Sequence, residues 1–454
     1  MVTMHNLIKE MGRKIVREES PNDPGKRRHL WNHDDIYEVL KNNLGTADIE
    51  SINLQCWNDK EIHLSPKVFK GMDLGNLKLI NLSGCEFLKE LPDMSKASKL
   101  EKVYLFFCTS LRHVHSSILS NHNLVELYLA NCTRLRSLDA SECRNLKEFS
   151  MLSERTCIEN VPSPITLGLM NSLTILSLNY VKLVSLPASI KHLSNLQQLY
   201  LRQCTWLQSI PELPQSIKCL DASGCSSLKA LFTSTCSWPG SHLINPRYPF
   251  VVNLNYCYKL GEDTMTGIVM YFVLLTIGAV YQQPTPGKLL SCNDGSLACV
   301  PLSKLPDVFN FQTRKGGYIS IQVPLNSDLM AIIFCFAVCS PLCTYLSGSC
   351  FVHVSNGETM EYRAFLPIGC NIGDSVVLWY NEHFNGSIMN GIKESRALSS
   401  PTDEHTKVSF QLDGIYTRGT NNAKEVGMYP IYASELHSCF STDIKRCWVT
   451  TSHS

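Results

Sequence analysis

Cysteine spacing offers the first opportunity for chemistry in this sequence. Cys335, Cys339 and Cys343 recur every four residues, a spacing that would line one face of a helix with thiolate ligands for a metal ion. The segment around them is apolar and strand-like, and the three side chains would not converge there. We therefore expect buried structural thiols and no metal site.

The chain contains no motif for phosphate binding or covalent catalysis. The pairs Gly25-Lys26 and Gly287-Lys288 lack the upstream glycine and the following Ser or Thr of a G-x-x-x-x-G-K-[ST] loop. The patterns H-E-x-x-H, G-x-S-x-G and paired C-x-x-C do not occur. We expect no catalytic residue, no metal ion and no cofactor held by this chain alone, and therefore no enzyme.

Length and composition indicate a globular chain of several domains. Its 454 residues suggest about three domains. Apolar residues make up 44% and charged residues 18%, which is too hydrophobic for disorder. The 41 basic and 40 acidic residues leave no overall charge that would attract nucleic acid. Twenty cysteines, with no signal peptide in the first residues, predict reduced thiols in the cytoplasm or the nucleus.

The clearest pattern is a leucine repeat. Between Leu74 and Leu231, 33 of 158 residues are leucine. The spacing L-x-x-L-x-L, followed in most copies by x-x-C, recurs with a period typical of leucine-rich repeats, and residues 139–172 hold degenerate copies. Six better copies begin at Leu77, Leu100, Leu124, Leu173, Leu196 and Ile217. Each copy supplies one strand that cannot bury its own apolar face, so the copies must stack as a solenoid, with the cysteine as a small buried residue.

The same repeats predict a binding surface. In L-x-L the leucines point inward and x points outward, from a parallel sheet that lines the concave face, because strand side chains alternate. Tyrosines at this position resemble the anchors of a protein interface, although tyrosine also suits a strand and covers its neighbours there. The candidate ligand-binding residues are Asn81, Tyr104, Tyr128, Ser177, Tyr200 and Asp221.

The first sixty residues predict two helices joined by a basic loop. An amphipathic helix begins near Asn6, whose side chain can cap its first turn. His5 would then lie at the positive end of a helix, which suits an anion. Residues 21–31 form a turn-rich loop with a basic cluster, and a second helix follows around residues 34–44. The simpler interpretation is a capped helix and a solvated basic loop.

After Leu231 the pattern changes to that of strands. A stretch rich in Pro, Gly and Ser, residues 238–249, marks a boundary. Short strand candidates then suggest a β-sandwich; they are residues 319–323, 331–338, 351–354, 376–380 and 408–412. The uncharged segment Met265–Tyr281 is either a helix packed on this domain or a membrane span. Its roughly 17 residues are short for a span, and we expect the packed helix.

Two parts of the chain resemble a known family. Residues 4–46 closely resemble the end of the nucleotide-binding module in plant TIR-type nucleotide-binding leucine-rich-repeat disease-resistance proteins. Their sequence is MHNLIKEMGRKIVREESPNDPGKRRHLWNHDDIYEVLKNNLGT. By that resemblance, His5 would lie near the phosphate of ADP, and the intact family binds ADP or ATP. Asn6 stands where the family's Met-His-Asp signature has aspartate.

The C-terminal third resembles the jelly-roll domain that follows the repeats in that family. The matching strand-like segments are GGYISIQVP (316–324), SVVLWY (375–380), KVSFQL (407–412) and VGMYPIYASE (426–435). KLPDVFNFQ (304–312) resembles the family's entry segment, with Val308 where tryptophan is usual.

Together these patterns predict an α/β leucine-rich-repeat solenoid with a short N-terminal helical segment and a C-terminal all-β jelly-roll or sandwich domain. The expected boundaries are 1–48 for the partial nucleotide-binding module, 49–235 for the repeats, 236–250 for a linker, 251–436 for the jelly roll and 437–454 for a divergent tail.

The resemblance implies a fragment of an intracellular immune receptor, in plant defence and signal transduction, that recognises a pathogen effector or a guarded host protein. It implies no nucleic-acid partner. One alternative is a truncated regulator that binds full-length receptors. A second is the NAD hydrolase activity of the intact family, whose TIR domain we do not find here, and a third is a membrane-attached repeat receptor. Without a phosphate loop or a TIR segment, we expect a fragment, a truncated relative or a gene model that lacks its front half.

Overall fold

The chain folds into two compact units. The computed structural model describes residues 6–54, 69, 71–91, 93–135, 143–151, 170–231, 250–281, 296–302, 312–315, 318–338, 345–354, 357–366, 375–399, 403–415 and 423–434. The first unit comprises Met1–Ile217 with Leu231–Thr235, and the second comprises Lys218–Ala230 with Cys236–Ser454. The short strand β11 (Ala230–Leu231) lies at the division between them.

The first unit begins with the two expected helices, α1 (Asn6–Glu19) and α2 (His33–Asn42). Because α1 starts at Asn6, its capping position would be residue 5, which lies outside the described residues. The apolar stripe of α1, with Ile8, Met11 and Ile15, is exposed. α2 is capped by Asn32, whose Oδ1 accepts hydrogen bonds from two amides of the first turn.

The basic loop between these helices is solvated only in part: Lys26 and Arg28 are exposed as expected, but Arg27 is buried. The loop contains η1 (Pro24–Lys26) and leads into β1 (His29–Leu30). Arg27 is 5% exposed. Its guanidinium donates to Asp35 Oδ2 at 2.6 Å, and also to the carbonyl oxygens of Ser20 at 2.8 Å and Pro21 at 3.0 Å. One arginine therefore joins the end of α1 to the start of α2.

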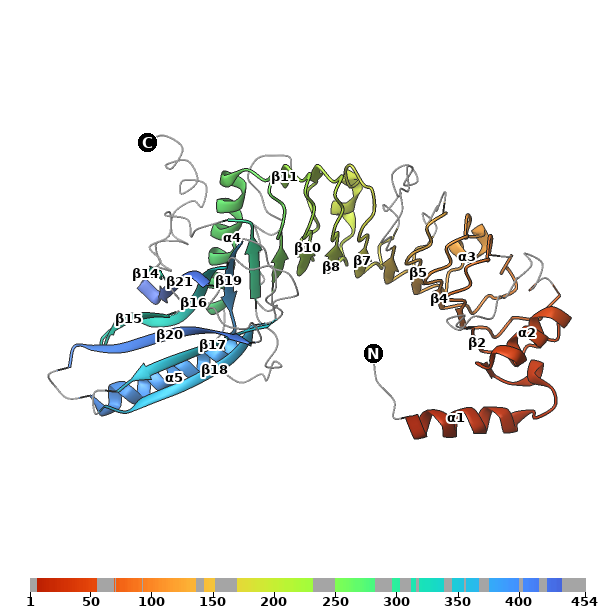
Figure 1. Cartoon of the computed structure of the whole chain (residues 1–454), viewed down its shortest axis with the longest axis horizontal. Helices are drawn as coiled ribbons and strands as arrows, with labels where there is room; N and C mark the ends of the chain where they lie inside the picture. The colour runs from red at the N-terminus through yellow and green to blue at the C-terminus, as the bar shows by residue number, and fades with distance from the viewer. Residues whose placement is uncertain are drawn as a thin grey trace. The chain divides into compact units, whose positions relative to one another are not determined.

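Short parallel strands form the predicted ladder of the first unit (Figure 1). They pair in chain order from β1 to β8. Most have three residues, of which the middle one is buried and the outer two are more exposed. They are β2 (Ser51–Asn53), β3 (Leu79–Asn81), β4 (Lys102–Tyr104), β5 (Glu126–Tyr128), β6 (Glu148–Ser150), β7 (Ile175–Ser177) and β8 (Gln198–Tyr200). The degenerate copy around Phe149 is thus a full member of the ladder, as β6.

The return segments of the repeats are irregular. They contain α3 (Ser116–Leu119), η3 (Ala188–His192) and β9 (Ser209–Ile210). The side chain of His115 accepts a hydrogen bond from the amide of Ser117 and so caps α3.

The repeat cysteines are buried, as predicted, and they also connect neighbouring repeats. The Sγ of Cys108 donates to the carbonyl oxygen of Leu82 at 3.2 Å, and the Sγ of Cys204 donates to that of Leu178 at 3.0 Å. Each of these thiols therefore donates to a carbonyl oxygen of the preceding repeat. An alanine in place of the cysteine would leave that oxygen without this donor.

The residue before six of the repeat cysteines has a left-handed backbone, and so does Tyr180, which precedes Val181 at the equivalent place. In four of these residues the amide donates to a carbonyl of the next repeat, as in the bond from Phe107 to the oxygen of Ala130 at 2.7 Å. Glycine and asparagine adopt this conformation readily, whereas other side chains meet a steric cost. The positions with φ between 57° and 78° are Gly84, Phe107, Asn131, Tyr180, Gln203, Gly224 and Tyr256.

The second unit opens with three parallel strands, β10 (Cys219–Asp221), β12 (Val251–Asn253) and β13 (Ser296–Val300). After β12, Leu254, Cys257 and Leu260 are buried with the spacing of the repeat. The Sγ of Cys257 donates to the carbonyl oxygen of Ala222 at 3.1 Å, the same link that the earlier cysteines make. β12 therefore carries a further copy, in a stretch that the sequence assigned to the C-terminal domain.

Two antiparallel sheets follow in the second unit and enclose one core. The first has the order β13-β19-β16-β21-β14 and the second β15-β20-β17-β18. Side chains of both sheets, including Phe334, Trp379 and Phe410, form this core. The strands are β14 (Gln312–Lys315), β15 (Tyr318–Pro324), β16 (Leu329–Val338), β17 (Tyr345–His353), β18 (Thr359–Leu366), β19 (Ser375–Tyr380), β20 (His405–Ile415) and β21 (Ala423–Tyr432). The predicted solenoid followed by an antiparallel sheet domain is confirmed. Residues 232–249, which hold most of the expected linker, and the tail from 435 lie outside the described residues.

The sheet domain also contains two long helices. α4 (Glu262–Tyr281) covers the segment for which a membrane span was the alternative. It packs against β13, β16 and β19 and buries Ile268, Val269 and Phe272. In the part of the chain that the structure describes, no helix combines the length and the apolar character needed to cross a membrane. The second helix, α5 (Glu382–Leu398), was not expected from the sequence; it buries Phe384 and Ile388 in the core between the sheets.

The left-handed backbone before the repeat cysteines predicts opposite effects of glycine on stability at two nearby residues, Gln203 and Thr205. Gln203 is exposed and has φ 57°, so Gln203→Gly should relieve the steric cost of the left-handed backbone. Glycine also raises the entropy of the unfolded chain, which offsets part of this gain, and the net rise in the free energy of unfolding should be about 0.5 kcal/mol. Thr205 is also exposed but has no positive φ, so Thr205→Gly should lower it by about 0.5–1 kcal/mol. Urea unfolding followed by circular dichroism measures both, and a loss of stability in both variants would contradict the assignment.

Arg27 predicts a local loss of stability. Arg27→Met leaves Asp35 and two carbonyl oxygens without their donor, and should destabilise the α1–α2 segment by about 2–3 kcal/mol, since the side chain of Asp35 is 26% exposed and recovers part of its hydration. The matched control is Arg28→Met: Arg28 is exposed and pairs with Glu19 at 3.3 Å, so less than about 1 kcal/mol is expected. Amide hydrogen exchange in residues 24–42 measures the difference, and equal exchange in both variants would disprove the structural role of Arg27.

Candidate functional site

The outer residues of the repeat strands form one continuous surface, here called the ladder face. It consists of two parallel rows, because first and third residues of a strand point to the same side. The first row is Leu79, Lys102, Glu126, Glu148, Ile175 and Gln198, and the third-position row is Asn81, Tyr104, Tyr128, Ser150, Ser177 and Tyr200. Neighbours within a row are Cα partners in the strand pairing, so the rows run across the strands in register.

The predicted binding residues do not all have the same environment. Tyr104, Tyr128, Ser177 and Tyr200 are half-buried in the third-position row. Asn81 is only 7% exposed, and its Oδ1 accepts hydrogen bonds from the amide and the hydroxyl of Ser83. Asp221 belongs to the second unit, is 4% exposed and accepts from the amide of Ser223 at 3.1 Å. His5 lies outside the described residues.

Two tyrosines donate their phenol protons to glutamates of the next strand. The hydroxyl of Tyr104 donates to Glu126, and that of Tyr128 donates to Glu148. Burial and the adjacent carboxylates raise the pKa of both phenols well above its ordinary value, so both are neutral donors. Lys102 Nζ lies 2.7 Å from Glu126 Oε1, and this hydrogen bond raises the pKa of Lys102.

Aromatic rings cluster at the same strands. The rings of Tyr104 and Tyr128 meet edge to face with centroids 5.3 Å apart, and the ring of Phe106 lies 5.6 Å from that of Tyr128. Such contacts fix the tyrosine rings before any ligand arrives, which lowers the entropy cost of binding.

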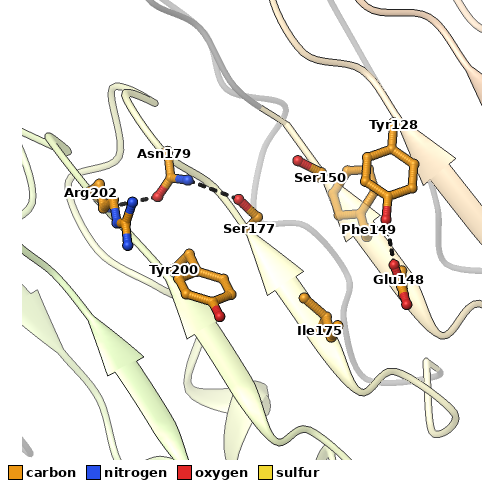
Figure 2. A pocket seen from close by; sticks show the side chains of 9 residues that line it. All are labelled: Tyr128, Glu148, Phe149, Ser150, Ile175, Ser177, Asn179, Tyr200 and Arg202. Carbon is orange, nitrogen blue, oxygen red and sulfur yellow. Dashed lines mark hydrogen bonds between the residues drawn. The ribbon is translucent and has the colours of Figure 1, made fainter. Parts of the chain in front are cut away.

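A pocket opens on the ladder face between β5 and β8 (Figure 2). Small Ser150 and Ser177 lie between the larger Tyr128 and Tyr200, which leaves a hollow of about 380 Å³. Its lining residues are Tyr128, Glu148, Phe149, Ser150, Ile175, Ser177, Asn179, Tyr200 and Arg202. Asn179 donates to Ser177 Oγ at 3.0 Å and accepts from the amide of Arg202 at 2.7 Å, so one edge of the pocket is held by hydrogen bonds.

The sequence pointed to part of this pocket and missed the rest. It identified Tyr128, Ser177 and Tyr200 through the outward position of L-x-L. The charged residues Glu148 and Arg202 were missed, although the signal was present. Glu148 lies two residues before Ser150, the third residue of β6, and Arg202 lies two residues after Tyr200, the third residue of β8. Residues two apart in an extended chain point to the same side, so the alternation that identified the outward residues also identifies these two.

The three cations of the N-terminal basic loop form ion pairs within the chain. Lys26 pairs with Asp23 at 3.1 Å, Arg27 with Asp35 at 2.6 Å and Arg28 with Glu19 at 3.3 Å. Each cation of the loop thus already has a carboxylate partner, and we derive no nucleotide chemistry from the described residues.

One serine–histidine pair in the sheet domain resembles a catalytic dyad but is structural. His353 Nε2 lies 2.9 Å from Ser409 Oγ, and its Nδ1 lies 3.2 Å from the hydroxyl of Thr359. A nucleophile needs access to substrate, whereas Ser409 is fully buried and also accepts a hydrogen bond from Tyr318. Burial lowers the pKa of His353, with a further contribution from Lys407, so the ring stays neutral near pH 7.

The cysteine pattern is represented by Cys335 alone, since Cys339 and Cys343 fall outside the described residues. Cys335 is fully buried in β16, and burial raises the pKa of its thiol, as expected for a structural cysteine. Across the described ranges, no group of three or more His, Cys, Asp or Glu residues is arranged to hold a metal ion.

Comparison with known proteins gives several relatives over part of their length. Disease resistance protein RPP5 of Arabidopsis thaliana is 30% identical over 362 residues, covering 70% of this chain and 24% of that protein. TMV resistance protein N of Nicotiana glutinosa is 25% identical over 299 residues, covering 46% of this chain and 26% of the relative. The protein SUPPRESSOR OF npr1-1, CONSTITUTIVE 1 of Arabidopsis thaliana is 34% identical over 216 residues, covering 33% of the chain and 14% of the relative. The chain thus spans about a quarter or less of these relatives.

Comparison with family models and solved structures adds little. No family model matches the chain. The leucine-rich repeat domain of the type III effector XCV3220 (XopL) aligns with 18% identity and a TM-score of 0.34, covering 58% of this chain and 92% of that domain.

Most of the short parallel strands bury an aliphatic residue at their middle position. This ladder defines the first unit as a leucine-rich-repeat solenoid. With its sequence relatives, the chain is a distant homologue of plant TIR-type nucleotide-binding leucine-rich-repeat disease-resistance proteins over part of their length.

The two raised phenol pKa values predict a loss of stability in alkaline solution. The folded-state values lie above the unfolded value of about 10, so the contribution of the neutral phenols is complete below about pH 10 and is lost as the pH rises through the folded values. The free energy of unfolding should therefore fall above about pH 10, and less steeply in the Tyr104→Phe/Tyr128→Phe variant. Urea unfolding between about pH 8 and pH 11 measures the slopes. Identical slopes in the two proteins would show that these hydroxyls do not titrate as described.

Proposed function

We propose that this chain is the recognition part of a plant disease-resistance receptor and binds a protein ligand through the ladder face, with the sheet domain as a second contacting part. The ligand would be a pathogen effector or a host protein that the receptor guards, and binding would take place inside the cell. The relationship to disease-resistance proteins supports the biological setting. The eleven cysteines in the described part are reduced thiols, which agrees with an intracellular location.

The pocket on the ladder face is the observation that carries the proposal. Protein interfaces depend on a few aromatic and charged anchors around a depression that excludes water. Tyr128 and Tyr200 border such a depression, and Glu148 and Arg202 supply one charge of each sign. Tyr128, Glu148 and Tyr200 lie in strands of the ladder and Arg202 lies just after β8, so little order has to be gained on binding.

The proposal predicts which substitutions remove ligand binding. Against a panel of candidate effectors co-expressed with the chain in leaf cells, Tyr128→Ala/Tyr200→Ala should weaken binding at least about tenfold, because both anchors are lost. The control is Trp206→Ala, since Trp206 is 56% exposed and does not line the pocket; its binding should stay within about twofold of the wild type. Split-luciferase complementation measures binding, and circular dichroism confirms that each variant is folded.

Two outcomes would contradict this placement of the site. Unchanged binding in the double tyrosine variant would remove the pocket from the interface. Loss of binding in the tryptophan variant alone would move the interface to the flank of the repeats.

A further inference from the structure

In the described part of the ladder face, the carboxylate of Glu148 forms no ion pair. Its carboxylate accepts a hydrogen bond from the phenol of Tyr128 (Figure 2). Glu126, one strand away, accepts the same kind of bond from Tyr104 but also pairs with Lys102 at 2.7 Å. Among the residues that the structure describes, no lysine, arginine or histidine lies within ion-pair distance of Glu148. Within the described ranges, the pocket therefore has a carboxylate whose hydrogen-bond partner is a neutral phenol.

Aromatic rings border the same space. Tyr128 on β5 and Tyr200 on β8 are separated by two strands that carry serine, a spacing of about 14 Å between the outer strands. The face of a tyrosine ring attracts a cation, and the attraction grows when water is displaced. A carboxylate that accepts one hydrogen bond from a phenol still has lone pairs for further donors.

The opposite end of the pocket differs in charge. The guanidinium of Arg202 lies over the ring of Tyr200, with its Cζ 5.8 Å from the centroid. An apolar or acidic ligand group near Glu148 would desolvate or repel the carboxylate, which is costly without a compensating bond. A cationic group satisfies the carboxylate, and a planar guanidinium can both bond to it and stack on tyrosine.

We infer that the pocket accepts an arginine side chain from the surface of the protein ligand, with its guanidinium at Glu148 and its stem between Tyr128 and Tyr200. This inference rests on the proposed function and adds the chemistry of the partner at one position. The ligand would be a protein that presents an exposed arginine able to reach the floor formed by Ser150 and Ser177.

Binding of a capped amino acid tests this chemistry directly. The probe is Nα-acetyl-arginine methylamide, titrated into the full chain with a ¹³C label in the isoleucine δ1 methyl groups, because Ile175 lines the pocket next to Glu148. The Ile175 signal should shift and saturate with a Kd of about 1–10 mM, the range expected for one charge-assisted bond and one cation–π contact. The citrulline analogue, which has the same shape but no charge, should bind at least about tenfold more weakly.

Two glutamine variants form a matched pair. Glu148→Gln should weaken arginine binding at least about tenfold, while Glu126→Gln, which removes the other phenol-bonded carboxylate but does not line the pocket, should leave it within about twofold. Glu148→Asp keeps the charge and should lie between the wild type and Glu148→Gln. Unchanged isoleucine signals elsewhere in the spectrum show that the variants are folded.

The inference is overturned if arginine causes no shift of Ile175, if citrulline binds equally well, or if Glu148→Gln has no effect. A stronger response to the lysine analogue would also overturn the assignment to arginine. These results are independent of the effector test. Arginine binding without any effect of the tyrosine variants on the protein ligand would refute the proposed function and leave the pocket chemistry intact. The reverse result would refute only the inference.

Discussion

The constraint on which the first unit depends is that no repeat can satisfy itself. A three-residue strand has too few backbone groups and only one buried side chain, such as Leu127 or Leu199, so both its hydrogen bonds and its apolar surface need neighbours. The same dependence appears in the turns, where the left-handed residue and the cysteine each bond to an adjoining repeat. Stability is therefore a sum of contacts between neighbours along the ladder, and a weak copy such as the one at Phe149 is retained because the copies on each side hold it.

This division of roles separates the fold from the surface. The middle residue of each strand is committed to the core, while the first and third residues face outward in two rows. The sizes of the side chains in the third-position row then determine where this surface is raised and where it is hollow. Where tyrosines adjoin, as at Tyr104 and Tyr128, the rings pack together; where serines intervene, at Ser150 and Ser177, a pocket results.

The sequence predicted the parts of the structure that have a period and missed those that depend on single contacts. Leucine spacing located the ladder, and strand alternation located Tyr128, Ser177 and Tyr200. It did not locate α5, whose sequence contains two glycines and two asparagines, residues with weak helix preference. Tertiary packing of Phe384 and Ile388 stabilises that helix instead. Nor did it distinguish a solvated arginine from the buried Arg27, because the carbonyl oxygens that bind its guanidinium have no signature in the side-chain pattern. The six outward residues were also treated alike, although Asn81 turns its amide back toward Ser83.

Recognition by such a surface follows from charge as well as shape. Two cations near the ladder are paired with carboxylates of the chain, Lys78 with Glu50 and Lys102 with Glu126. A paired charge offers a ligand little, because the ligand must compete with a partner that is already in place. Glu148 differs because a phenol orients its carboxylate without neutralising it, and a phenol with a raised pKa remains a donor at any physiological pH. A group that is oriented, charged and bordered by aromatic rings has little order left to lose on binding, so under the proposed function selectivity for the partner would concentrate there. The other outward residues of the rows could change without cost to the core that holds them.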